Sequence, residues 1–230
     1  MIRPDEKKAA VEFDLWAESG RAESMAEGHR SAFLQAIENW NFSSEHTVAD
    51  IGCGNGWVCR EMIGRGAGAA IGVDISPKMI ERARSLAQDD PRFRFEVSSA
   101  ATLPVPDGSL HRVTSVEALY YVPDPQSALE EWARACDRGA QLAIVIDLFK
   151  ENEATHSWLD ALDVEAHLLG ADELVAMLKK AGFTQASWRL VQDDRPIKAE
   201  HEFTPSRYWP SYAMYRSYRE TGSLIVDGVR

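Results

Sequence analysis

Glycine occupies alternate positions in the segment 52–56, Gly-Cys-Gly-Asn-Gly, directly after the apolar run 47–51. Glycine lets the backbone adopt positive φ angles and approach a ligand closely. Asp74 ends a second apolar run, 70–73, which lies about 20 residues beyond the glycines. A carboxylate there can accept hydrogen bonds from both hydroxyl groups of a ribose. The spacing therefore predicts a site for a nucleoside-containing cofactor.

Short apolar runs alternate with helical patterns along the chain. The runs are 47–51, 70–73, 93–97, 112–116, 141–147 and 186–191. Ser76-Pro77 and Asp124-Pro125 mark helix starts, and Gly182 marks a helix end. This alternation predicts an α/β fold, a Rossmann-like three-layer sandwich around a mostly parallel seven-stranded sheet.

The chain is expected to form one domain, 1–230, with three zones. Residues 1–42 are predicted to be a helical cap, 46–192 the cofactor-binding core, and 193–230 an aromatic segment with a last strand at 223–226. Trp16, Met25 and Phe33 offer apolar surface in the cap. We expect the cap to close over the cofactor, exclude water and become ordered when ligand binds.

The glycine spacing separates two cofactor classes. A dinucleotide site of the form G-x-G-x-x-G needs glycine at position 57, where this chain has Trp57. With Asp50, the G-x-G-x-G pattern and the segment 115–122, the chain resembles the class I S-adenosylmethionine-dependent methyltransferases. The resemblance is greatest to their small-molecule branch, with methyltransferase domains of type 11 or 25, and covers 47–147 well.

The resemblance implies a role for each matching position. The first motif lies against the methionine part of the cofactor, Asp74 holds the ribose, and Ile75 and Met79 pack on the adenine. In the segment 98–104, Ser99 stands where family members commonly have an Asp that accepts the adenine amino hydrogen. The residues expected to bind S-adenosylmethionine are Asp50, Gly52, Cys53, Gly54, Gly56, Asp74, Ile75, Met79, Ser99, Ala100 and Glu117.

The expected reaction is direct in-line transfer of the methyl group to a small molecule. The sulfonium is already a good leaving group, so alignment in a dry pocket supplies most of the rate, and a base is needed only where the acceptor must lose a proton. Tyr120 and Asp147 end adjacent strands on the cofactor side of the sheet and are the predicted catalytic residues. The tyrosines of 203–218 form either an aromatic wall for the acceptor or a helix packed on the core; Tyr208, Tyr212 and Tyr215 share one helical face.

No metal is expected. Asp160, Asp163 and His167 share a helical face, which a solvated acidic surface explains as well as a metal site does. The other histidines, His29 among them, are scattered without ligand spacing, and His156, which follows the fifth apolar run, is expected at the surface.

Charge and composition limit the partners. The net charge of −11 argues against a nucleic-acid acceptor and favours a cationic or neutral one. No apolar run is long enough to span a membrane, and the three cysteines show no paired spacing, which fits the cytoplasm. Nothing in the sequence indicates the oligomeric state. Two alternatives remain open: a non-catalytic S-adenosylmethionine-binding protein, and a nicotinamide-dependent oxidoreductase, against which Trp57 argues.

Overall fold

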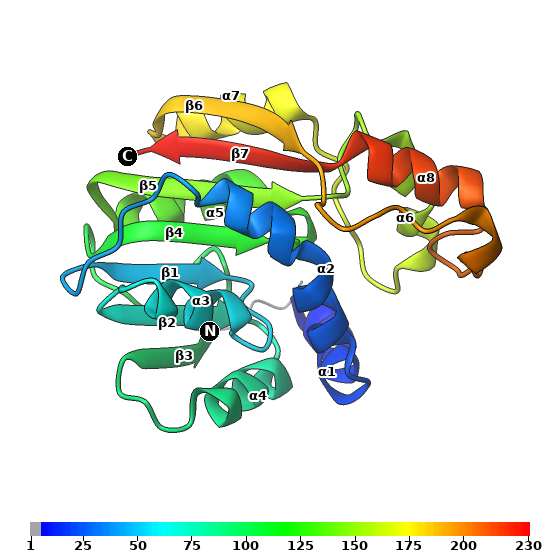
Figure 1. Ribbon diagram of the computed structural model, residues 1–230. Helices are drawn as coiled ribbons and strands as arrows, with labels where there is room; N and C mark the ends of the chain where they lie inside the picture. The colour runs from blue at the N-terminus through cyan, green and yellow to red at the C-terminus, as the bar shows by residue number, and fades with distance from the viewer. Residues whose placement is uncertain (1–5) are drawn as a thin grey trace.

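The computed structural model describes residues 6–230, so the first five residues of the expected cap lie outside the described part. Seven strands form one sheet in the order β3-β2-β1-β4-β5-β7-β6 (Figure 1). The strands are β1 Thr47–Ile51, β2 Ala69–Asp74, β3 Phe93–Val97, β4 Leu110–Val116, β5 Cys136–Ile146, β6 Thr184–Val191 and β7 Ser223–Val229. Only β7 runs antiparallel to its two neighbours. The predicted mostly parallel sheet is confirmed.

Eight α-helices surround the sheet in the described residues. They are α1 Lys7–Glu18, α2 Arg21–Ala36, α3 Trp57–Gly64, α4 Pro77–Ala87, α5 Pro125–Ala135, α6 Trp158–Ala161, α7 Ala171–Ala181 and α8 Tyr212–Thr221. The hydroxyl of Ser76 and the carboxylate of Asp124 cap α4 and α5, as the sequence predicts. None of the helices in residues 6–230 is both long and apolar enough to cross a lipid bilayer.

The alternation of side chains along β5 divides the core into two layers. Ile144 and Ile146 belong to one apolar cluster, together with Leu129 and Trp132 of α5 and residues of α7. Ala143 and Val145 face the opposite cluster, which contains residues of α2, α3 and α4. Successive strand residues point to opposite faces, so a strand covered on both sides is apolar throughout.

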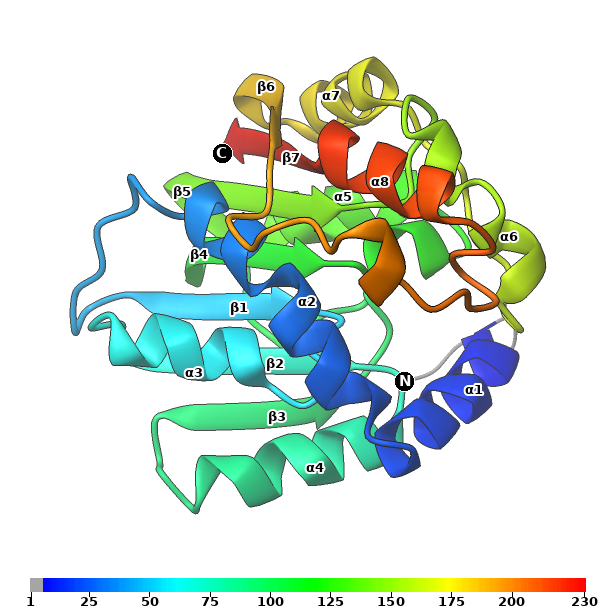
Figure 2. The same cartoon turned by 45° about the vertical axis from the view of Figure 1, so that its right-hand side comes forward.

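The two N-terminal helices have different surroundings, and the sequence does not predict this difference. Phe33 is fully buried in the core layer with α3 and α4, so the second half of α2 is part of the sandwich. Of the two N-terminal helices, α1 and the first half of α2 lie beyond the carboxyl ends of the strands (Figure 2). Asp14 of α1 accepts hydrogen bonds from the Ser76 hydroxyl and from the backbone N–H of Lys78, which ties α1 to α4. Phe33 therefore has no free surface with which to close over a ligand.

Candidate functional site

The glycine loop follows β1 and is folded against the end of β2. The backbone N–H groups of Gly52 and Cys53 both donate to the carbonyl of Val73, at 2.7 and 3.0 Å. Gly52 has φ +79°, and a Cβ placed on it would lie 2.2 Å from the Cβ of Ala118. Gly56 has φ +75°, and its Cβ would lie 2.7 Å from the ring of Phe95. Neither position can hold a side chain without displacing its neighbours.

Asp74 joins the end of β2 to this loop. Its carboxylate accepts hydrogen bonds from the N–H of Gly54 and the N–H of Ser76, both at 2.9 Å. Burial raises the pKa of Asp74 to about 6, although the hydrogen bonds from Ser76 and Gly54 work against this rise. The carboxylate is thus fixed at the mouth of the loop with acceptor sites remaining for a ligand hydroxyl.

A first cavity of about 990 Å³ opens where the loop, Asp74 and α1 meet. Apolar side chains, including Met79 and Val73, line it beside the buried carboxylate of Asp74. The predicted cofactor residues that line it are Gly52, Cys53, Gly54, Asp74, Ile75, Met79, Ala100 and Glu117. Apolar walls, a glycine turn and a fixed carboxylate fit S-adenosylmethionine.

Three predicted cofactor residues do not line this cavity. Asp50 lies beneath the loop, where its carboxylate accepts a hydrogen bond from Thr114 at 2.8 Å and burial raises its pKa to about 7. Gly56 begins α3 and packs on Phe95. Ser99 is fully buried behind the cavity wall. The first two shape the loop rather than contact a ligand.

The hydroxyl of Ser99 instead binds a carboxylate from the start of the chain. It donates to Glu6 at 2.5 Å and accepts from the N–H of Ala101 at 3.1 Å. Glu6 itself lines the first cavity. A carboxylate therefore reaches the adenine-edge segment from a residue 93 positions earlier in the sequence. Sequence reasoning missed Glu6 because no local pattern connects it to this segment.

Glu117 lies just after β4 and joins the first cavity to a second one. Its φ of +54° is rare for a residue with a side chain and aims the carboxylate into the site. One carboxylate oxygen accepts the N–H of Asp147 at 2.6 Å, and the other accepts the hydroxyl of Tyr120 at 2.7 Å. Glu117 lines both cavities.

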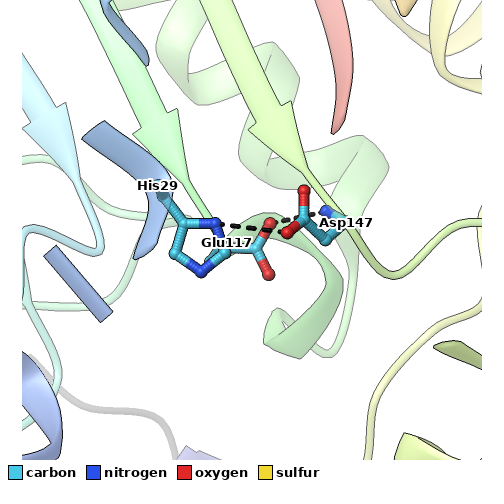
Figure 3. Close-up of side chains that lie close together, drawn as sticks. All are labelled: His29, Glu117 and Asp147. Carbon is cyan, nitrogen blue, oxygen red and sulfur yellow. Dashed lines mark hydrogen bonds and ion pairs between the residues drawn. The ribbon is translucent and has the colours of Figure 1, made fainter. Parts of the chain in front are cut away.

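His29 of α2 lies close to this carboxylate, although the sequence shows no ligand spacing around it. The side chain is buried and lines both cavities. Its Nδ1 lies 3.4 Å from Oδ2 of Asp147, and the other ring nitrogen points away from Asp147 (Figure 3). Within residues 6–230, His29, Glu117 and Asp147 form the one group of His, Cys and carboxylate side chains whose donor atoms all lie within 4.8 Å.

The side chains of His29, Glu117 and Asp147 shift one another's pKa values. Burial alone would lower the pKa of His29, but the charges of Glu117 and Asp147 outweigh it and raise this pKa to about 9. Burial raises the pKa of Glu117 to about 7, against the opposing charge of His29. Burial would also raise the pKa of Asp147, yet His29 and neighbouring hydroxyls hold it below its usual value. At neutral pH the histidine is therefore cationic, Asp147 anionic, and Glu117 close to its midpoint.

The predicted catalytic residues Tyr120 and Asp147 both hydrogen bond to Glu117, but only Tyr120 lines a cavity. Tyr120 is 2% exposed, borders the second cavity and donates to Glu117. Asp147 is fully buried, lines neither cavity and accepts a hydrogen bond from Tyr218. Asp147 can therefore act on a ligand only through His29, Glu117 or Tyr218.

The second cavity, of about 1,390 Å³, extends from Glu117 to the aromatic C-terminal segment. Its ring-bearing lining residues are His29, Tyr120, Tyr121, Trp158, Tyr208, Trp209, Tyr215 and Tyr218. Tyr208, Tyr212 and Tyr215 were expected on one helical face, and this is wrong for Tyr208. The helix α8 begins at Tyr212, after the Ser211 cap, so Tyr208 precedes it. Pro210 explains this start, since proline is poorly tolerated inside a helix.

The acidic face predicted from Asp160, Asp163 and His167 does not form. α6 ends at Ala161, where Leu162 adopts an extended backbone. Only Asp160 of the three therefore lies on the helix. Asp163 pairs with Arg207, and the N–H of His167 donates to the carbonyl of Tyr120.

Comparison with known proteins agrees with this geometry. Residues 49–144 match the family described as a methyltransferase domain. A chain described as a candidate methyltransferase of Haloferax volcanii, solved in complex with the Trm112 methyltransferase activator, is 32% identical with a TM-score of 0.86. The match covers 95% of this chain and 97% of that one.

Two curated relatives are shorter matches. Methyltransferase GfsG of Streptomyces halstedii is 29% identical over 58% of this chain and 49% of its own length. The 27-O-demethylrifamycin SV methyltransferase of Amycolatopsis mediterranei is 37% identical over 42% of this chain and 37% of its own. The chain thus spans half or less of these relatives. On its full-length similarity and its cofactor loop, the chain belongs to the class I S-adenosylmethionine-dependent methyltransferases.

Proposed function

We propose that the protein transfers the methyl group of S-adenosylmethionine to a small molecule held in the second cavity. One observation carries this proposal: the two cavities meet, and Met25, His29, Glu117 and Tyr121 line both. A donor in the first cavity and an acceptor in the second would face each other across these four side chains. The named activity of the rifamycin relative, also on a small molecule, supports this reading.

The chain's own residues would hold the cofactor in the first cavity. Asp74 would bind the ribose hydroxyls, and Ile75 and Met79 would pack on the adenine. The glycine loop would lie against the methionine arm. When bound, S-adenosylmethionine supplies an activated methyl group on a sulfonium.

The protein would contribute alignment, exclusion of water and a place for a proton. In-line displacement forms one bond to the acceptor atom as the carbon–sulfur bond breaks. A hydroxyl or amine acceptor also loses a proton, and a carboxylate of Glu117 with a pKa of about 7 suits its acceptance. Tyr120 and Asp147 would then act as positioning residues, because both hydrogen bond to Glu117.

The Asp74→Ala variant tests the cofactor assignment. Loss of its charge-assisted hydrogen bonds should weaken S-adenosylmethionine binding by about 1–3 kcal/mol. Calorimetry measures the affinity, and Asp90→Ala, a change at a carboxylate paired only with Arg92, serves as the control. Equal affinity of the folded variant and the native protein would contradict the assignment.

Release of S-adenosylhomocysteine tests the reaction itself. We expect it when the protein and S-adenosylmethionine are incubated with fractionated small molecules, and not with RNA or DNA, since the net charge of −11 disfavours polyanions. Stabilisation by S-adenosylmethionine without release would favour the non-catalytic alternative. Stabilisation by NAD instead would favour the oxidoreductase.

A protein partner and a compartment complete the proposal. Because similarity to the Haloferax volcanii chain extends over 95% of this chain, we expect an activator of the Trm112 kind to bind it. Co-expression followed by size-exclusion chromatography should give co-elution of the two proteins, and separate peaks would contradict this.

The cysteines Cys53, Cys59 and Cys136 are free and buried, which supports a reducing cytoplasm.

A further inference from the structure

The charge of the second cavity is opposite to that of the protein. The chain carries a net charge of −11. Yet four of the residues that line this cavity have basic side chains, and Glu117 is the one carboxylate among its lining residues in the described chain. The cations are Arg21, Arg195, Lys198 and Arg219. The field inside the cavity is therefore set by arginine and not by the overall acidity.

Arg21 has no carboxylate partner within residues 6–230. Its guanidinium lies 3.7 Å from the ring centroid of Trp16 and 4.7 Å from that of Tyr208, and it donates to the Tyr208 hydroxyl. Stacking leaves the edge of a guanidinium, with its N–H groups, open to a planar anion. Arg21 is therefore held by aromatic rings while its charge is not neutralised.

Two further arginines share one carboxylate. Arg195 pairs with Asp193, and Arg219 lies 3.5 Å from an oxygen of the same carboxylate. The side chain of Arg219 is only 9% exposed, and its buried Nε has no hydrogen-bond partner among residues 6–230. A buried donor left unpaired costs free energy, which a ligand acceptor would recover. Arg219 also lies beside the Tyr215 ring, which borders the cavity.

The inner end of the cavity has different chemistry. There Glu117 borders the first cavity as well, Tyr120 donates a hydrogen bond to Glu117, and the backbone N–H of Asp147 donates to the same carboxylate. There a hydroxyl or amine could donate a hydrogen bond to the Glu117 carboxylate, beside the buried His29. The aromatic walls between the two ends suit a flat or apolar body.

We propose that the methyl acceptor is an organic anion, with a carboxylate or phosphate group held by the arginines of the second cavity and a flat apolar body between the aromatic walls. Its methylated atom would lie at Glu117. This assignment rests on the proposed function, since it names the substrate class for the same site. It reverses the cationic or neutral acceptor that the net charge favours.

The test uses the full chain loaded with S-adenosylhomocysteine and four probes that share one ring system. The probes are 2-naphthoate, 2-naphthyl phosphate, neutral 2-naphthamide and cationic 2-naphthylmethylammonium. Thermal shift and calorimetry should show binding of one or both anions, weakened by added salt, and weaker or absent binding of the other two. Whether the carboxylate or the phosphate binds more tightly identifies the acidic group.

Variants assign the binding to the cavity. Arg21→Gln should weaken anion binding about tenfold or more, as for a lost charge-assisted hydrogen bond. Arg219→Gln provides a second test should the first variant fold poorly. Arg207→Gln is the matched control, because Arg207 also lies near the Tyr208 ring, at 5.3 Å, but pairs with Asp163 and does not line the cavity.

Three results would overturn the inference: preferred binding of the cationic or neutral probe, binding of none of the four, or equal anion affinity in the Arg21, Arg219 and Arg207 variants. Failure of the native protein to bind S-adenosylhomocysteine would instead contradict the proposed function. The two failures are therefore distinguishable in one experiment.

Discussion

Replacement of His29 by Gln should remove a pH-dependent stabilisation that is specific to the buried cluster. In the native protein the pKa of His29 is raised from its ordinary value of 6.5 to about 9, against the desolvation that would lower it. One pH unit of such a difference is worth about 1.36 kcal/mol, so proton binding by this side chain favours the folded state by about 3 kcal/mol.

The sign follows from the direction of the pKa change. A histidine that binds its proton more tightly when folded gives its full stabilisation below about pH 6.5 and loses it as the pH rises through about 9. The difference in unfolding free energy between the native protein and His29→Gln should therefore be constant near pH 6 and shrink by about 3 kcal/mol towards pH 9.

Urea unfolding at several pH values measures this difference, and NMR titration of the imidazole measures the pKa directly. His201→Gln, a change at an exposed histidine, is the control and should show no such trend. Asp147→Asn should lower the pKa of His29, because Asp147 is one of the two carboxylates that raise it. A pH-independent difference, or titration of His29 near 6.5, would refute the electrostatic argument.

Three further predictions concern the cofactor loop and its cover. Gly52→Ala should destabilise the protein by about 1–3 kcal/mol in urea unfolding, because its Cβ would lie 2.2 Å from that of Ala118 at φ +79°. Gly64→Ala is the control and should be neutral or stabilising, because a Cβ on Gly64 would have no atom within 4 Å. Glu6→Gln should weaken binding of S-adenosylhomocysteine in calorimetry but leave binding of its inosine analogue, which lacks the amino group, nearly unchanged. Equal losses of affinity for the two ligands would mean that Glu6 does not contact the adenine edge. Hydrogen exchange should show added protection of 12–30 on S-adenosylhomocysteine binding, and equal protection with and without ligand would rule out closure of the cap.

Local patterns were sufficient for the cofactor loop. The glycines after β1 and the acid that ends β2 are set by short-range geometry: positive φ angles and an N–H of the loop that bonds to Asp74. The strand alternation likewise predicts a parallel sheet because strands covered on both faces are apolar throughout. These features depend on neighbours in sequence.

The junction between the cavities depends on contacts between distant residues instead. His29 lies on a helix before the first strand, and nothing near it in sequence signals that it will meet the ends of β4 and β5. The contact between Glu6 and Ser99 also joins residues far apart. Single-sequence patterns carry no signal for such pairs, so the place of His29 in the site could not be predicted.

The covers of the two cavities come from opposite ends of the chain, and this has a kinetic consequence. Phe13 and Trp16 of α1 border only the first cavity, whereas Trp209 and Tyr215 of the C-terminal segment border only the second. Each ligand can therefore exchange with solvent past its own cover while the other stays bound. Steady-state turnover should follow a random order of addition and release, with S-adenosylhomocysteine competing against S-adenosylmethionine at every acceptor concentration.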